Sequence, residues 1–230
     1  MKYFLLSFDD GTVHDKRFVE LLNQYQIPCT FNLNTGLEDF VWAYEGNPVV
    51  RQHLAETVEQ YRGHEIASHS RTHPRLEQLP PPRLRCEVEE DCVALKRIFG
   101  VKELGFGVPF TVCGEREINI IRRFVRYIRL SEYSDSFALP DDPYHIPIHA
   151  LYNDPDGREK ITAFAESDLP DSVFVMAGHS YELEFLNHWE YMEELLQYIK
   201  SFGFEMITTM EFVNRCYPKE YQEVKRCLKT

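Results

Sequence analysis

Strand-like and helix-like segments alternate along almost the whole chain, and this order limits the fold more than any other feature. Short segments rich in apolar residues are predicted as strands at Lys2–Phe8, Ile27–Leu33, Glu65–Ser68, Leu104–Val108, Tyr127–Leu130, Ile146–Ala150, Val173–Ala177 and Glu205–Thr208. Repeated strand–helix order is typical of a parallel sheet or barrel. No low-complexity linker interrupts the order, so we predict an α/β fold with residues 1–230 as a single domain.

The segments between these strands carry apolar residues at helical spacing. Helices are predicted at Thr12–Gln24, Val50–Arg62, Pro82–Phe99, Glu115–Phe124, Lys160–Glu166 and Trp189–Ile199, with a helical tail after the last strand. The segment 36–49 is predicted as a loop rich in aromatic residues, among them Phe40, Trp42 and Tyr44.

Composition excludes several classes of protein. The formal net charge of -12 disfavours a nucleic-acid partner, and the basic cluster Arg122, Arg123, Arg126 and Arg129 is interpreted as the solvated face of a helix running into a strand. No apolar run approaches the length of about 18 residues that a membrane span needs, so no membrane partner is expected.

The six cysteines form no C-x-x-C pair. We predict free thiols and a cytoplasmic location.

Polar residues follow most of the predicted strands. They are Asp9, Asp10, Asn32, Asn34, His69, Arg129, Glu132, His149 and His179, whereas Pro109 and Phe110 follow the fourth predicted strand. In a parallel sheet these strand ends lie on one face, which carries the active site in α/β barrels and open α/β sheets. A single polar strand end would mean little, because loops are generally polar.

His69 and His73 are four residues apart and can hold one metal ion from the same turn or helix face. A third ligand is needed, and the adjacent Asp9 and Asp10 are the candidates. Neighbouring side chains on an extended segment point in opposite directions. One aspartate can therefore bind the metal while the other faces the reacting water, which is the pattern of a metal hydrolase.

Five segments resemble the motifs of the polysaccharide deacetylase family, carbohydrate esterase family 4. Ser7–Gly11 resembles the motif T-F-D-D-G, Ile27–Asn32 the second strand, and His69–His73 the motif H-[ST]-x-x-H. Phe106–Phe110 stands where the family has an aromatic-Arg-x-Pro-[FY] motif, and Met176–His179 where it has L-x-H. The resemblance extends from Lys2 to about Thr209.

The resemblance implies a distorted (β/α) barrel of about seven parallel strands. It implies Asp10, His69 and His73 as ligands of one divalent metal ion, Asp9 as general base, His179 as general acid and the backbone N–H of Phe110 as oxyanion donor. Zinc suits these ligands best, and cobalt, manganese or iron would also fit. The implied reaction removes an acetyl group from an N-acetylated or O-acetylated sugar or a related small molecule.

The chain departs from the family pattern at two places. The arginine that orients the base aspartate in the family is Gly107 here, and we predict Arg129 as a replacement within about 4 Å of Asp9. The aspartate that pairs with the acid histidine is not recognisable, and Glu132, Asp135 and Asp142 are open alternatives. These departures predict a divergent member that acts on a substrate smaller than a polymer.

Substrate contacts are predicted at Trp42, Asn34 and Tyr181, on a small-molecule or oligosaccharide substrate. Two other functions remain open. One is hydrolysis of another linear or cyclic amide on the same scaffold, and the other is a non-catalytic carbohydrate-binding protein. The sequence predicts no oligomeric state.

Overall fold

The computed structural model describes residues 1–218, and its centre is one sheet of nine parallel strands in the order β8-β7-β6-β5-β2-β1-β10-β9, with β11 beside the first part of β1. The strands are β1 (Lys2–Asp9), β2 (Thr30–Leu33), β5 (Glu65–Ser68), β6 (Phe106–Gly107), β7 (Ile128–Tyr133), β8 (Ile146–Ile148), β9 (Ala150–Leu151), β10 (Ser172–His179) and β11 (Glu205–Met206). A separate antiparallel hairpin is formed by β3 (Val41–Tyr44) and β4 (Asn47–Val50).

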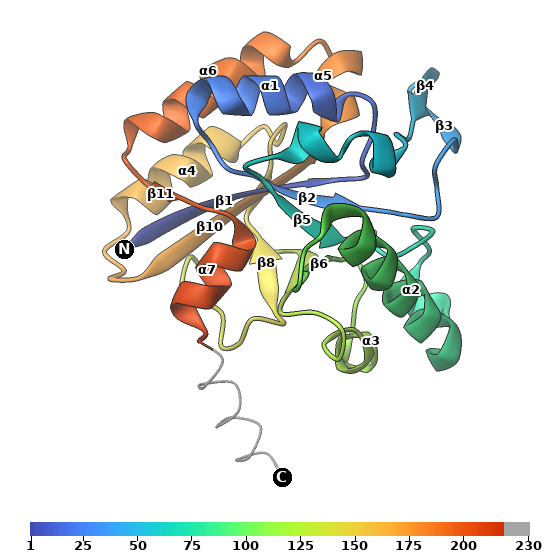
Figure 1. Ribbon diagram of the computed structural model, residues 1–230. Coiled ribbons are helices and arrows are strands. Elements are labelled where there is room, and N and C mark those ends of the chain that lie inside the picture. Colours follow the sequence, from blue (N-terminus) through green and yellow to red (C-terminus); the bar gives the residue numbers. More distant parts are fainter. Residues whose placement is uncertain (219–230) are drawn as a thin grey trace.

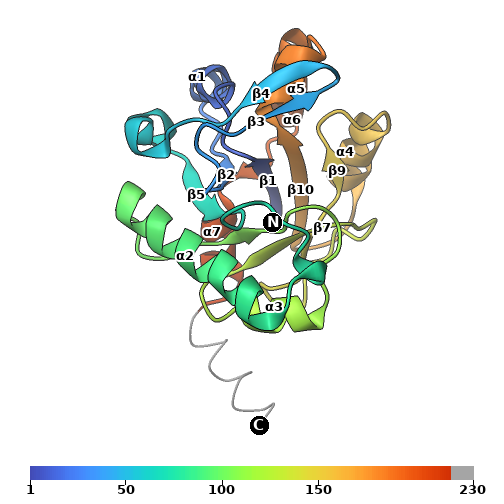
Figure 2. The same ribbon diagram turned by 90° about the vertical axis from the view of Figure 1, so that its right-hand side faces the viewer.

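Helices surround this sheet (Figures 1 and 2). They are α1 (Asp15–Tyr25), α2 (Pro81–Phe99), α3 (Glu115–Ile121), α4 (Gly157–Glu166), α5 (Ser180–Phe185), α6 (Trp189–Ser201) and α7 (Thr209–Cys216). The predicted α/β class and parallel strand arrangement are confirmed. In the part of the chain that the structure describes, no helix has both the length and the apolarity to cross a bilayer.

Alternation along β1 explains how the strand serves both the core and the site. Phe4, Leu6 and Phe8 belong to the cluster that also contains Phe18 and other buried helix residues. The opposite face of the strand starts with Tyr3 and Leu5, which pack in an inner cluster with residues of α7 such as Phe212. Further along the same inner face the strand carries Ser7 and Asp9, so the polar residues lie towards its carboxyl end.

The barrel has a seam between β8 and β9, which stand at the two ends of the sheet order although they are consecutive in the chain. His149 lies between them. Its backbone N–H donates to the Val175 carbonyl at 2.9 Å, and its Nδ1 accepts from the Val175 N–H at 3.0 Å. Its Nε2 lies 3.0 Å from the Ser136 carbonyl. His149 was expected among the polar residues of the active face, but it is 1% exposed and holds the seam instead.

Segment 50–62 is not the predicted helix. It contains two 3₁₀ turns, Leu54–Glu56 and Val58–Tyr61. The reason is a set of contacts to the loop after β1. The Val13 N–H donates to Val50, and the Gln52 N–H donates to Gly11 at 3.1 Å, which keeps the start of the segment extended.

Two further expectations concern the loop 36–49 and the cysteines. The loop contains the β3–β4 hairpin, and the spacing of two between Trp42 and Tyr44 puts both rings on the same face of β3. Five cysteines are free thiols, as predicted: Cys29, Cys86, Cys92, Cys113 and Cys216. Cys227 and most of the predicted helical tail lie outside the described residues.

We predict that the His149 seam makes the fold sensitive to acid. Burial lowers the pKa of His149 to about 4, whereas an unfolded histidine titrates near 6.5. Between these values the unfolded chain binds a proton that the native state does not, so the contribution of His149 is complete above about pH 6.5 and is lost as pH falls towards 4. Its upper limit is about 3 kcal/mol.

Urea unfolding of the unaltered protein and of His149→Gln, each at pH 7.5 and pH 5, measures this contribution. The unaltered protein should lose more stability on acidification than the variant, because glutamine does not titrate. Equal losses in the two proteins would show that His149 does not cause the acid sensitivity.

Candidate metal centre and catalytic site

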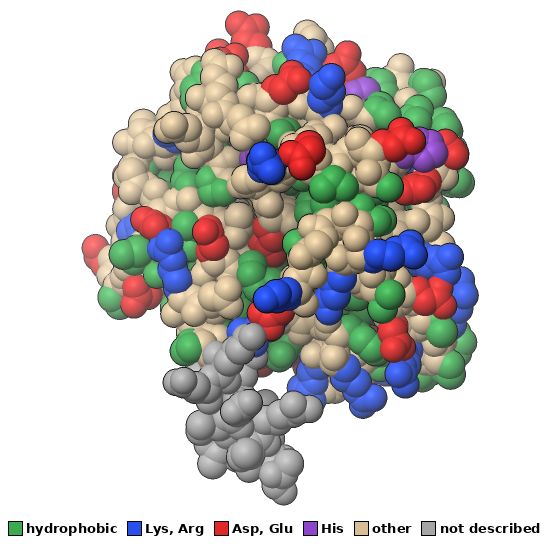
Figure 3. Space-filling model, viewed as in Figure 1, with side chains coloured by type: hydrophobic (Ala, Val, Ile, Leu, Met, Phe, Trp, Pro, Cys, Tyr) green, Lys and Arg blue, Asp and Glu red, His purple; other side chains and the backbone are tan. Residues whose placement is uncertain are grey.

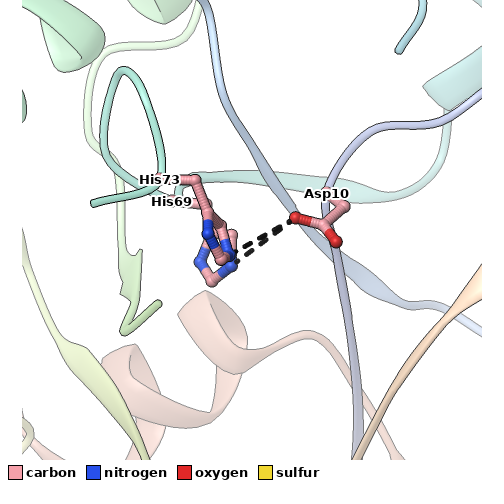
Figure 4. A group of neighbouring side chains, drawn as sticks. All are labelled: Asp10, His69 and His73. Carbon is pink, nitrogen blue, oxygen red and sulfur yellow. Dashed lines mark ion pairs between the residues drawn. The ribbon is translucent and has the colours of Figure 1, made fainter. Parts of the chain in front are cut away.

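Asp10, His69 and His73 meet at the carboxyl ends of β1 and β5 (Figure 4). Asp10 directly follows β1 and His69 directly follows β5. The Asp10 Oδ1 atom is 3.6 Å from Nε2 of His73 and 4.0 Å from Nε2 of His69. One potential ligand atom from each residue lies within 4.8 Å of the others. The structure therefore brings the three predicted ligands together.

The protonation states of these side chains suit a cation. Burial lowers the pKa of His69 well below its usual range, and burial also lowers the pKa of His73. Burial would raise the pKa of Asp10, but the positive charges of Arg51 and of the protonated His179 outweigh burial, so the pKa of Asp10 is lowered. Two neutral imidazoles and one carboxylate are the forms that bind a metal ion.

The geometry also fits a metal ion with tetrahedral preference. Metal–ligand bonds of about 2.0–2.2 Å place neighbouring ligand atoms roughly 3.3–3.6 Å apart, so small side-chain movements suffice. The Nδ1 atom of His69 lies 2.8 Å from the Gly107 carbonyl oxygen. That contact fixes the proton on Nδ1 and leaves the lone pair of Nε2 directed to the cluster.

Four of the eight non-glycine residues with positive φ in the described part of the chain lie at or beside this site. Asp10 has φ 90°, Ser70 has φ 61°, His73 has φ 51° and Phe110 has φ 57°. Non-glycine residues rarely adopt positive φ, and such strain is typical of active sites and ligand clamps. The strain supports a functional role for this cluster of loops.

Asp9 lies beside the cluster with its two carboxylate oxygens in different environments. Oδ1 accepts hydrogen bonds from Nη2 of Arg129 at 2.5 Å and from Nδ2 of Asn32 at 2.7 Å. Oδ2 lies 3.9 Å from Nε2 of His69. One oxygen is therefore held by the protein, and the other faces the candidate metal ligands.

The predicted contact between Arg129 and Asp9 is present, and it corrects the interpretation of the basic cluster. Arg129 is 1% exposed rather than solvated. Its Nη1 donates to Ser131 at 3.0 Å and its Nε to Ser7 at 3.3 Å. Every nitrogen of the guanidinium therefore has a polar partner inside the barrel.

Gly107 makes room for this arginine. A Cβ atom at position 107 would lie 2.7 Å from Nη2 of Arg129 and 2.6 Å from Cγ of Asn32. Gly107 and Arg129 are register neighbours on β6 and β7. The absence of a side chain on one strand thus permits the long side chain of the next strand to reach Asp9.

His179 ends β10 beside Asp10, with Nε2 3.9 Å from Asp10 Oδ2. Its Nδ1 is 3.4 Å from Oε2 of Glu182, an ion-pair distance without hydrogen-bond geometry. Burial alone would lower the pKa of His179, but the carboxylates of Glu182 and Asp10 outweigh burial and raise the pKa to about 9.

None of the three carboxylates predicted to pair with His179 does so. Glu132 and Asp135 are exposed, and Asp142 contacts His145 at 2.9 Å. Glu182 takes their place from the first turn of α5.

The predicted substrate-binding residues differ in how far their side chains are already engaged by other protein groups. Trp42 is half-buried on the hairpin, and its ring meets Tyr181 edge-on at 5.4 Å between centroids. Tyr181 is 6% exposed and lies 5.1 Å from the His179 ring. Asn34 is committed to protein groups, because its Nδ2 donates to the carbonyls of His69 and Ser70 at 2.6 and 2.7 Å and its Oδ1 accepts from Arg51.

Phe110 is 41% exposed, and its ring lies 4.6 Å from the His73 ring. Among residues 1–218, none accepts a hydrogen bond from its backbone N–H. This N–H thus remains available for an oxyanion.

Three residues of the site were not assigned from the sequence: Asn32, Arg51 and Glu182. Asn32 stood among the polar strand ends, and its contact with Asp9 follows from the register between β1 and β2. Glu182 is three residues after His179, a spacing that brings side chains together on a helix. Arg51 follows a hairpin that the sequence did not predict, so no local pattern pointed to it.

Residues 1–124 match the sequence profile of the family described as "Polysaccharide deacetylase", and the chain belongs to this family. No curated protein matches the chain by sequence.

Solved structures show a similar fold. The Xyl-CE4 domain of a multidomain xylanase from the hindgut metagenome of Trinervitermes trinervoides has 20% identity and a TM-score of 0.61, with 93% of this chain and 90% of that chain covered. The chitin deacetylase from Colletotrichum lindemuthianum has 18% identity and a TM-score of 0.63, with coverages of 94% and 87%. The family 4 acetyl xylan esterase from Clostridium thermocellum, in complex with a cobalt ion, has 18% identity and a TM-score of 0.61, with coverages of 92% and 90%. At these identities the likeness establishes the distorted-barrel fold.

We predict that Arg129 and Asp9 are strongly coupled. Unfolding free energies of Arg129→Met, Asp9→Asn and the double variant should give a coupling energy of about 2 kcal/mol or more, because the pair is buried and charge-assisted. The matched control is the exposed pair of Arg17 and Glu184, 3.3 Å apart, for which about 0.2–1 kcal/mol is expected. A coupling at Asp9 no larger than that of the control would contradict the ion-pair assignment.

Proposed function

We propose that the protein is a metal-dependent hydrolase that removes acetyl groups from N-acetylated, or less often O-acetylated, sugars or related small molecules. The observation that carries the proposal is that the two carboxylate oxygens of Asp9 have different partners. Arg129 and Asn32 bind Oδ1, and Oδ2 remains beside the Asp10–His69–His73 cluster. A carboxylate fixed in this way has one oxygen available to take a proton.

Asp10, His69 and His73 would hold one divalent ion, with zinc favoured by the donor set and cobalt, manganese or iron also compatible. Such an ion polarises the acyl carbonyl and lowers the pKa of water.

Asp9 acts as general base in this proposal. Its Oδ2 accepts the proton of the attacking water, and the charge-assisted hydrogen bond from Arg129 to Oδ1 keeps the carboxylate correctly directed. The backbone N–H of Phe110 donates to the oxyanion that develops on the carbonyl.

His179 acts as general acid, with Glu182 as its carboxylate partner. Glu182 faces Nδ1, so Nε2 is the atom that gives its proton to the departing nitrogen or oxygen. The products are acetate and the free amine or alcohol, and His179 recovers a proton as Asp9 releases one.

The aromatic residues of the hairpin support a sugar substrate, because aromatic rings stack on the apolar faces of pyranose rings. Trp42 and Tyr44 flank Tyr181, which lies next to His179. We propose Trp42 and Tyr181 as substrate contacts and assign to Asn34 the support of the His69–Ser70 backbone. A substrate smaller than a polymer, a cytoplasmic location and a single domain stay predictions from the sequence.

The expected result for His73→Ala is a large loss of bound metal together with loss of acetate release. Elemental analysis gives metal per chain, and acetate release is followed on a panel of N-acetylated sugars and small amides. His145→Ala is the matched control, because His145 is paired with Asp142 and Glu115 outside the cluster. This control should retain both metal and activity.

Equal metal content in His73→Ala and the unaltered protein would contradict the ligand assignment. Bound metal without acetate release from any compound would favour the non-catalytic alternative. Release of product only from small or cyclic amides would favour the alternative function, hydrolysis of another linear or cyclic amide on the same scaffold.

A further inference from the structure

Arg51 joins the candidate metal ligand Asp10 to the β3–β4 hairpin. Its Nη2 is 2.8 Å from Asp10 Oδ1, and its Nη1 donates to the Asp10 carbonyl and to Asn34 Oδ1. The Cζ atom lies 4.7 Å from the centroid of the Trp42 ring. Arg51 is 6% exposed. The guanidinium is therefore held between the carboxylate of a metal ligand and the aromatic ring of the hairpin.

The hairpin also reaches the other side of the site. Trp42 and Tyr44 meet the Tyr181 ring at 5.4 and 5.2 Å, and Tyr181 lies 5.1 Å from the His179 ring. The alternate residue Val41 is 50% exposed, so the other face of the hairpin is turned to solvent. Figure 1 shows the hairpin projecting from the body of the protein. Its placement thus depends on contacts along one face.

We propose that Arg51 is a positioning residue that couples metal binding at Asp10 to the placement of the β3–β4 hairpin. The inference rests on the proposed function, because it takes Asp10 as a metal ligand. Hydrogen bonds to a ligating carboxylate orient it and strengthen metal binding. A cation at Asp10 changes the charge that Arg51 faces and therefore its contact with Trp42. Linkage is reciprocal, so loss of the Trp42 contact must also weaken metal binding.

Metal affinity tests the first half of the coupling. Isothermal titration of metal-free protein with zinc chloride should give a Kd about tenfold or more higher for Arg51→Met than for the unaltered protein. Trp42→Ala should raise the Kd about twofold to fivefold, the effect of one cation–π contact. The matched controls are Arg17→Met and Trp189→Ala, which disrupt a similar pair with Cζ 4.3 Å from the ring centroid, outside the site. Both controls should bind zinc as the unaltered protein does.

Fluorescence tests the second half. The chain has two tryptophans, so Trp189→Phe leaves Trp42 as the single emitter. Zinc should change the Trp42 emission with the same midpoint as the calorimetric titration, and Arg51→Met should abolish the change at saturating zinc. In Trp42→Phe, the emission of Trp189 should not respond.

Three results would overturn the proposal: zinc binds to Arg51→Met as tightly as to the controls, Trp42 emission still responds in Arg51→Met, or Trp42 does not respond in the presence of Arg51. If Arg51→Met does not fold, the zinc affinity of Trp42→Ala is the deciding measurement, because Trp42 is only half-buried. An unchanged zinc affinity in this variant contradicts the coupling. A lack of zinc binding by the unaltered protein would overturn the metal site and the coupling together. Zinc binding that is insensitive to Arg51 would overturn the coupling alone.

Discussion

The buried ion pair between Arg129 and Asp9 is the interaction on which the site depends. Asp9 ends β1, beside the Asp10–His69–His73 cluster, where a buried carboxylate needs a partner of opposite charge to offset the loss of its hydration. The partner comes from β7, which lies several strands away in the sheet order, so the guanidinium crosses the barrel interior. It can do so because Gly107 leaves that space empty and because Ser7 and Ser131 satisfy its other nitrogens. Strand order, a glycine and two serines thus together allow Arg129 to reach and hold the carboxylate of Asp9.

Much of this arrangement could be predicted because it follows from periodicity and strand ends. Alternating strands and helices specify a parallel sheet, and parallel strands bring Asp10 and His69 to one face whatever the loops do. Arg129 could be proposed as a neighbour of Asp9. Whether its side chain points into the barrel depends on the register of β7, and the hydrophobic pattern of the sequence does not determine that register. The same limit misplaced His149, whose side chain is used by the seam of the barrel.

The parts that escaped prediction are those set by tertiary contacts between loops. Residues 50–52 were expected in a helix, but backbone hydrogen bonds to Gly11 and Val13 hold them extended. That change places Arg51 against Asp10 and turns a loop into a hairpin whose aromatic residues face Tyr181. Glu182 was not predicted because it lies on α5, a short helix that begins just after His179 and that the sequence pattern did not indicate. In each case the residue that contacts the site is remote in sequence from its partner or lies in an element that the sequence did not predict.

The measurement that tests the account most directly is anomalous diffraction from crystals grown with zinc or cobalt. The account predicts one strong peak at the cluster, bonded to Asp10, His69 and His73 at about 2.0–2.2 Å, while Asp9 Oδ1 keeps its contacts with Arg129 and Asn32 and does not bind the metal. A peak at another place, or a metal bound by Asp9 with Arg129 displaced, would contradict the assignment of ligand and base.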